Sequence, residues 1–184
     1  MSVGIEPWST EQPSNRPRFI DVWVMDSSYS LGTKENIATA IAQIVSKGEI
    51  DISSVKDMVG KVSAVCIVNA ARIRKLVISG HGGRKGFTIG ADIIGMPNIH
   101  QYQVDLQKLN SFLDNTCSVV CLDHCNTGQN QELLQLLSNM WGGVEIRAFE
   151  GIQSAWNDQT IDSTFEGEGP VAICKFSNCR VNRN

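Results

Sequence analysis

The sequence lacks the features that mark several large classes of protein. No run approaches the ~18 consecutive apolar residues of a membrane-spanning helix, so no membrane span is expected. The 184 residues carry 16 Lys and Arg against 19 Asp and Glu, and this net charge of -3 provides no basic surface for nucleic acid. There is no internal repeat and no low-complexity segment, and 42% of the residues are hydrophobic, which is typical of a globular chain. We therefore expect one folded domain that binds neither nucleic acid nor a membrane.

The sequence also lacks the marks of a secreted protein. Its first residues include Pro7, Pro13 and Pro17 and show no charged start followed by an apolar stretch, so no secretory signal is expected. Six cysteines in 184 residues do not reach the density of small secreted domains. We expect a cytoplasmic protein with reduced thiols, and a disulfide between Cys174 and Cys179 stays open as an alternative.

The hydrophobic pattern predicts strands that alternate with helices. Residues 1–17 are expected to form an extended leader and residues 18–184 a single α/β domain, with a long loop at 151–169 that has no predicted element. Alternation of this kind indicates crossover connections and a three-layer sandwich, in which a mostly parallel six-stranded sheet has helices on both faces. The predicted strands are 19–26, 49–52, 75–80, 117–123, 144–150 and 170–176, with a hairpin at 86–95, and the predicted helices are 33–48, 54–72, 104–114 and 128–141.

Two of the predicted strands run directly into loops that carry reactive side chains. The first loop is SGHGG (79–83), which contains His81, and the second is LDHCNTG (122–128), which contains Cys125. Ligands of open parallel sheets bind beyond the carboxyl ends of the strands. If the two strands are neighbours in the sheet, His81 and Cys125 come together at one edge.

A histidine beside a cysteine has an established chemistry. The imidazole can act as a general base toward the thiol and can protonate a leaving amine. The N-terminus of a helix at 128–141 would favour the thiolate of Cys125, because it presents the positive end of the helix dipole. The backbone N–H groups of Gly82 and Cys125 could hold a developing oxyanion, as acyl transfer requires. The glycines around His81 leave room for a peptide backbone to approach the imidazole.

Together the two motifs resemble the paired signature of the caspase-hemoglobinase-fold (clan CD) cysteine peptidases, most closely the metacaspase and paracaspase branch. In that branch one hydrophobic strand ends in Ser-Gly-His-Gly, and a later one ends in Asp-x-Cys followed by a Ser/Thr-Gly pair. The resemblance covers residues 19–176 as topology, and two motifs in this order are more specific than either alone. It implies a cysteine endopeptidase in which Cys125 is the nucleophile and His81 is the general acid/base.

The same resemblance implies a set of substrate-binding residues and cleavage after Arg or Lys. Asp123 would pair with the basic side chain, because a carboxylate selects a cation by charge and binds Arg in bidentate geometry. Ser79 would line the same pocket, and Asp26 would be a second acidic residue in it. Ser154 and Trp156, in the loop after the fifth strand, lie where this fold often wraps a substrate's backbone, although a Trp more often packs a loop onto the core.

No cofactor is needed for this chemistry, and no metal site is expected. The resemblance also raises calcium activation, which is common in the metacaspase branch. RKGFTIGADIIG (84–95) argues against it, because it replaces the acidic segment that follows the histidine motif there. A zinc site is a weaker alternative, because Cys121 lies within a predicted strand and the spacing matches no closed ligand set. Its ligands would be Cys121, His124, Cys125 and His81. We interpret His124 as a structural residue.

A second functional class remains open from the sequence. A binding or scaffold module that kept the fold and lost efficient catalysis would contain an unreactive Cys125. For the peptidase, the expected partner is a protein or peptide with a basic cleavage site, and Arg84 and Lys85 are candidate positions of self-cleavage. The sequence does not indicate an oligomeric state.

Overall fold

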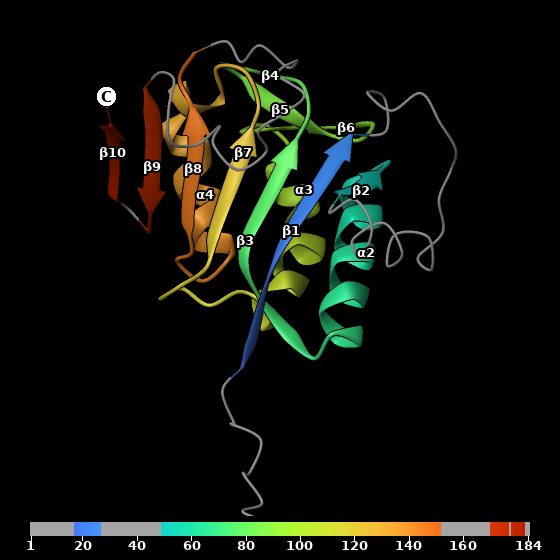
Figure 1. Ribbon diagram of the computed structural model, residues 1–184. Helices are drawn as coiled ribbons and strands as arrows, with labels where there is room; N and C mark the ends of the chain where they lie inside the picture. The colour runs from blue at the N-terminus through green and yellow to red at the C-terminus, as the bar shows by residue number, and fades with distance from the viewer. Residues whose placement is uncertain (1–16, 27–48, 152–169, 177, 183–184) are drawn as a thin grey trace, which may run out of the picture.

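A seven-stranded sheet runs through the centre of the described part of the protein (Figure 1). The structure is a computed structural model, and it describes residues 17–26, 49–151, 170–176 and 178–182. Across the sheet the strands follow the order β10-β9-β8-β7-β3-β1-β2. Their bounds are β1 Arg18–Asp26, β2 Glu49–Ile52, β3 Ala71–Ser79, β7 Val119–Asp123, β8 Glu145–Phe149, β9 Val171–Lys175 and β10 Asn178–Asn182.

The sheet is mostly parallel, as the sequence predicted. The pairings of β1 with β2, β1 with β3, β3 with β7 and β7 with β8 are parallel, whereas β9 runs antiparallel to β8 and to β10. The predicted number of six strands is wrong, because β10 adds a seventh strand at one edge. Its sequence, NCRVN, is mostly polar and its residues alternate between exposed and half-buried, so it lacks the hydrophobic signal of the inner strands.

The described helices pack against one face of the sheet (Figure 1). Alternate residues of the inner strands point to this face and are fully buried with helix side chains in a single core cluster, for example Val24, Ile78, Leu122, Met58 and Leu133. Such alternation follows from the two-residue period of a strand. The predicted helix at 33–48 and residues 1–16 of the leader predicted at 1–17 lie outside the described residues, so helices on both faces remain a prediction.

The helices begin and end at different residues from those predicted. Helix α2 ends at Val68 rather than near residue 72, because the side chain of Asn69 donates to the Val65 carbonyl and Ala70 takes a positive φ of 45°. Helix α3 begins at Ile99, five residues before the predicted start, and continues as a short 3-10 helix. The bounds are α2 Val55–Val68, α3 Ile99–Leu106, η1 Gln107–Ser111, η2 Thr127–Gln129 and α4 Gln131–Met140.

A small three-stranded antiparallel sheet lies beside the carboxyl ends of the parallel strands (Figure 1). It contains β4 (Gly82–Gly83), β5 (Gly86–Ile89) and β6 (Asp92–Gly95) in that order. The predicted hairpin at 86–95 is confirmed as β5 and β6, and Gly90 takes a positive φ of 59° at its bend. This sheet follows β3 directly, so its position fixes the surroundings of His81.

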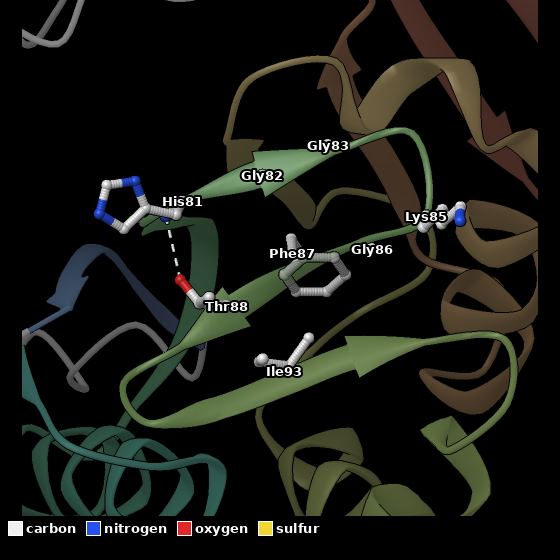
Figure 2. A pocket seen from close by; sticks show the side chains of 8 residues that line it. All are labelled: His81, Gly82, Gly83, Lys85, Gly86, Phe87, Thr88 and Ile93. Carbon is white, nitrogen blue, oxygen red and sulfur yellow. Dashed lines mark hydrogen bonds between the residues drawn. The ribbon is translucent and has the colours of Figure 1, made fainter.

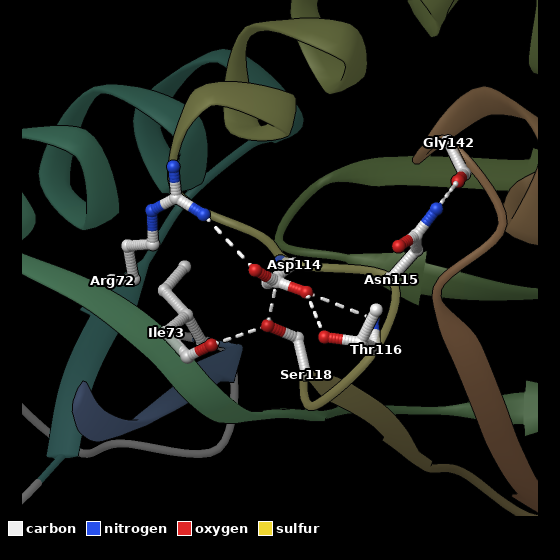
Figure 3. A network of polar contacts seen from close by, with 7 residues as sticks. All are labelled: Arg72, Ile73, Asp114, Asn115, Thr116, Ser118 and Gly142. Atoms are coloured by element: carbon white, nitrogen blue, oxygen red, sulfur yellow. Dashed lines mark hydrogen bonds and ion pairs between the residues drawn. The ribbon is translucent and has the colours of Figure 1, made fainter. Parts of the chain in front are cut away.

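A polar network ties the start of β7 to the start of β3 at the opposite end of the sheet (Figure 3). Ser118 donates its hydroxyl to the Ile73 carbonyl, and Arg72 forms an ion pair with Asp114 at 3.0 Å. Asp114 also accepts hydrogen bonds from Thr116, which together with Arg72 hold the pKa of its carboxyl below the ordinary value. These contacts fix the turn before β7 and hence the register of β7 against β3.

Cys174 and Cys179 form a disulfide between β9 and β10. The two residues face each other directly in the antiparallel register, with 4.1 Å between their Cα atoms. The expectation of reduced thiols is therefore wrong for this pair. Four cysteines are free in the described residues, namely Cys66, Cys117, Cys121 and Cys125. None of the described helices is long and apolar enough to cross a membrane.

Candidate active site

The two motifs lie at the ends of adjacent strands. β3 and β7 are hydrogen-bonded neighbours, and their register places Ser79 opposite Asp123. His81 follows Ser79 by two residues and Cys125 follows Asp123 by two, so the two reactive side chains extend from equivalent points of one sheet edge. The condition stated for the two motifs, that their strands are neighbours in the sheet, is therefore met.

The chain segments that follow the two strands pack closely together. A Cβ built on Gly82 would lie 2.7 Å from the Cys125 carbonyl oxygen and 2.6 Å from the Cβ of His124. Contacts under 3.0 Å are not tolerated, so only glycine allows β4 to approach the Cys125 loop this closely. At the neighbouring Gly83 a Cβ would meet nothing within 4 Å. Gly82 therefore serves the contact between the two loops, and access of a peptide backbone to His81 stays a prediction.

Cys125 lies in a tight turn between β7 and α4. The residue after it, Asn126, has a positive φ of 56° and donates its backbone N–H to the Gly151 carbonyl. Asparagine tolerates this left-handed conformation better than most residues, and such backbone geometry is concentrated at functional sites. The predicted start of the following helix at residue 128 is wrong, because η2 intervenes and α4 begins only at Gln131. The α4 dipole is therefore further along the chain from Cys125 than the sequence suggested, and it does not support activation of the thiol.

Thr88 in β5 connects the residues around both loops. Figure 2 shows its hydrogen bond with His81. Its hydroxyl oxygen accepts the His81 N–H at 3.0 Å and donates to the Asp26 carboxylate at 3.1 Å. Its own N–H donates to the His81 carbonyl at 2.8 Å, and its carbonyl lies 2.9 Å from Nε2 of His124. All the polar groups of Thr88 are thus used. The sequence analysis did not single out Thr88, since its partners come from β1 and from the segments after β3 and β7, which lie in separate parts of the chain.

His124 is structural, in agreement with the interpretation from sequence. Its ring is buried and packs against Phe87 with 5.0 Å between ring centroids. Nε2 must carry the proton, because its partner, the Thr88 carbonyl, can only accept. Nδ1 is then an unprotonated nitrogen, buried without a hydrogen-bond partner. Burial lowers the pKa of His124 from 6.5 to about 4, so the ring is neutral at pH 7.

The acidic residues predicted to bind a cation occupy different surroundings. Asp123 is half-buried and accepts a hydrogen bond from the Ser79 hydroxyl at 3.2 Å, so these two predicted pocket residues lie together. Burial raises the pKa of Asp123 above its ordinary value, and the Ser79 hydrogen bond partly offsets this. Asp26 is only 2% exposed and one of its oxygens accepts from Thr88, so it holds the hairpin in place. Its role in a substrate pocket stays a prediction.

The free cysteines differ in their surroundings. Burial raises the pKa of Cys66 to about 12 and that of Cys121 to about 11, which leaves both as unreactive thiols at neutral pH. Cys125 is half-buried, at a strand end that carries a histidine on the adjacent loop. Of these three cysteines only Cys125 is partly exposed, and Cys117, the fourth free cysteine, is exposed in the turn before β7.

The remaining expectations from the sequence concern Ser154, Trp156 and a metal site. Ser154 and Trp156 lie outside the described residues, so their predicted role stays a prediction. Among the residues that the structure describes, no three or more His, Cys, Asp or Glu side chains are grouped as a metal site would require. Cys121 and His124, two ligands of the zinc alternative, are both buried within the domain.

Comparison with known proteins gives no family for this chain: no family model matches it, and no curated protein matches it. The functional argument therefore depends on the geometry of the site. That geometry combines a half-buried thiol, an exposed imidazole on the neighbouring loop, the close approach of Gly82 to the thiol's loop, and a half-buried carboxylate two residues before the thiol. Covalent acyl transfer to a cysteine uses a nucleophilic thiol, a group that carries protons and a charged group that recognises the substrate.

Proposed function

We propose that this protein is a cysteine endopeptidase that cleaves after Arg or Lys. The observation that carries the proposal is the register of β3 and β7, which pairs Ser79 with Asp123 and sets His81 and Cys125 at equivalent points of one sheet edge. The close packing of Gly82 against the Cys125 loop adds support, because it brings backbone amides of both loops near the reacting centre.

The caspase-like three-layer sandwich is part of the same proposal. A mostly parallel sheet whose strand ends carry the site supports it, and so does the small sheet that directly follows the histidine motif. The proposal also requires helices on the second face of the sheet, for which the predicted helix at 33–48 is the candidate.

The proposed reaction begins at the thiol. His81 accepts the proton of Cys125, whose sulfur attacks the carbonyl carbon of the scissile peptide bond. The backbone N–H groups of Gly82 and Cys125 hold the negative charge on the carbonyl oxygen, and loss of one such donor typically costs about 2.7–4 kcal/mol of barrier. As the C–N bond breaks, His81 gives its proton to the departing amine. Water, deprotonated by His81, then hydrolyses the thioester and returns the free thiol, leaving a carboxylate on the first product.

Asp123 supplies the preference for a basic side chain in this proposal. Its carboxylate is partly removed from water and is held by a single hydroxyl, from Ser79, among the hydrogen bonds that the structure gives for its side chain. Burial without a counter-charge makes ionisation costly, so an arriving Arg or Lys would both restore the charged form and form an ion pair with it. Arg would be preferred over Lys where both oxygens are engaged.

A covalent probe tests the proposal. We expect a peptidyl acyloxymethylketone with Arg before the warhead to label the wild-type protein once, as an intact-mass shift. Cys125→Ala should abolish the label, His81→Ala should slow it strongly, and Asp123→Asn should slow it for the Arg probe but not for a matched probe with Ala. Cys117→Ala, which removes another free cysteine, is the control and should leave labelling unchanged.

The proposal fails if the folded wild-type protein takes up no label with calcium or without it. Circular dichroism establishes that each variant is folded. Labelling that persists in Cys125→Ala would also contradict the assignment of the nucleophile. An intact but unreactive Cys125 would favour a binding or scaffold module with the same fold.

A further inference from the structure

A hollow of about 270 Å³ lies beside His81 on the small sheet β4-β5-β6 (Figure 2). The backbone of Gly82, Gly83 and Gly86 lines one part of it, and the side chains of Thr88 and Ile93 line another. His81 lies at one end. The volume is below the ~300–1,000 Å³ of pockets for drug-sized ligands, so it is of the scale of a single side chain with its backbone.

Glycines and one exposed isoleucine create the hollow. Gly83 and Gly86 are opposed in the β4–β5 pair, so this part of the sheet carries no side chains. In the β5–β6 pair Ile93 lies opposite Thr88, and its aliphatic side chain is 67% exposed. An aliphatic wall beside bare backbone provides an apolar surface that the described residues leave uncovered.

Side chains alternate between the two faces of a strand, and this alternation shows on which side of the large sheet Asp123 lies relative to the hollow. Leu122 belongs to the core cluster on the helix face of the large sheet, and so do Phe87 and Ile94 of the small sheet. Asp123 is adjacent to Leu122 in β7 and therefore points to the opposite face. His81 lies at the sheet edge between the two. A peptide with its basic residue at Asp123 would pass His81 and continue toward the hollow.

We propose that the hollow binds an aliphatic side chain of the residue that directly follows the cleaved bond. This inference rests on the proposed function. In that reaction His81 protonates the departing amine, so the imidazole must face the residue that carries that amine. The hollow is a described cavity that His81 itself lines. Its lining is mostly apolar, although Lys85 and Thr88 line it as well as Phe87 and Ile93. The enzyme would therefore prefer substrates of the form Arg-Leu or Arg-Ile over Arg-Gly at the cleavage point.

Quenched-fluorescence peptides that differ only in the residue after Arg test this inference. We expect kcat/KM for Arg-Leu to exceed that for Arg-Gly by at least about 10-fold in the wild-type protein, the range that differences in a hydrophobic pocket provide. Ile93→Ser should bring the ratio close to 1. The matched control is Ile67→Ser in α2, because Ile67 is also 67% exposed and lies outside the site, and it should keep the wild-type ratio.

The outcomes separate the two proposals. An Arg-coumarin amide has no amino acid after the bond, so its hydrolysis by the wild-type protein reports the proposed peptidase activity alone. Hydrolysis of that amide together with equal rates for Arg-Leu and Arg-Gly would overturn the subsite and leave the peptidase standing. A preference for Arg-Asp over Arg-Leu would overturn it as well, since Lys85 at the hollow would then select the side chain by charge. No hydrolysis of any substrate would overturn both.

Discussion

The neutral, buried imidazole of His124 makes a strong prediction about stability and pH. In the unfolded chain this side chain has an ordinary pKa of about 6.5, whereas burial in the folded protein lowers it to about 4. Acid therefore protonates the unfolded state first. The stability that depends on the neutral ring is fully present above pH 6.5 and is lost as the pH falls toward 4. A difference of this size in pKa corresponds to about 3 kcal/mol, a large fraction of the ~5–15 kcal/mol that stabilises a typical domain.

Urea unfolding at pH 7, 6, 5 and 4 measures this loss. We expect His124→Gln, whose side-chain N–H can still reach the Thr88 carbonyl, to lose about 3 kcal/mol less than the wild-type protein between pH 7 and pH 4. The absolute stability of the variant at pH 7 does not matter, because only the change with pH is compared. His100→Gln, at an exposed position of α3, is the control and should follow the wild-type curve.

Equal losses for the wild-type protein and His124→Gln would refute the reasoning. They would mean that the ring is protonated in the folded state, with Nδ1 reaching a partner that the structure does not show. Titration of the histidine ring protons by NMR would then give a pKa for His124 near its ordinary value.

Two further predictions concern residues at the same sheet edge. Gly82→Ala should lower the free energy of unfolding by about 1–3 kcal/mol, because its Cβ would overlap the Cys125 carbonyl. The control, Gly83→Ala, should change that free energy by less than about 0.5 kcal/mol. Equal urea midpoints for the two variants would contradict the close packing. Asp123→Asn should be at least as stable as the wild-type protein at pH 7, since it removes a carboxylate that burial disfavours. That advantage should disappear on acidification, when the wild-type carboxyl is itself protonated, and a variant less stable at pH 7 would show that the charge is well compensated.

The sequence was sufficient for the elements whose signal is local. The apolar strands, the β5–β6 hairpin and the glycine stop after α4 were all predicted, because hydrophobic alternation and positive φ at Gly90 and Gly142 leave direct traces in the residue pattern. The edge strand β10 was missed because it buries little, and an edge strand needs few apolar residues. The start of α4 was placed early because Gly128 and Gln129 extend a helical pattern that a 3-10 turn interrupts.

The positions of the candidate residues at neighbouring strand ends were predictable, and the contacts that support them were not. His81, Cys125 and Asp123 stand out because motif and strand end coincide in the sequence. The role of Thr88 depends on hydrogen bonds to three segments that are distant along the chain, and no local pattern encodes them. The close approach of Gly82 to the second loop is of the same kind. Both features depend on contacts between segments that are far apart along the chain, and a single sequence does not show which segments come into contact.

The polar network at the amino ends of β3 and β7 has a consequence for heritable variation in this protein. Ser118 and Asp114 fix where β7 begins against β3. Because neighbouring side chains of a strand point to opposite faces, a slip of one residue would place His124 where Asp123 now lies opposite Ser79. A single-codon deletion in the turn at 114–118 that caused such a slip would replace a carboxylate by an imidazole at this position and leave the sequence of both loops unchanged. Natural selection can thus alter which side chains the loops present through changes at the end of the sheet farthest from them.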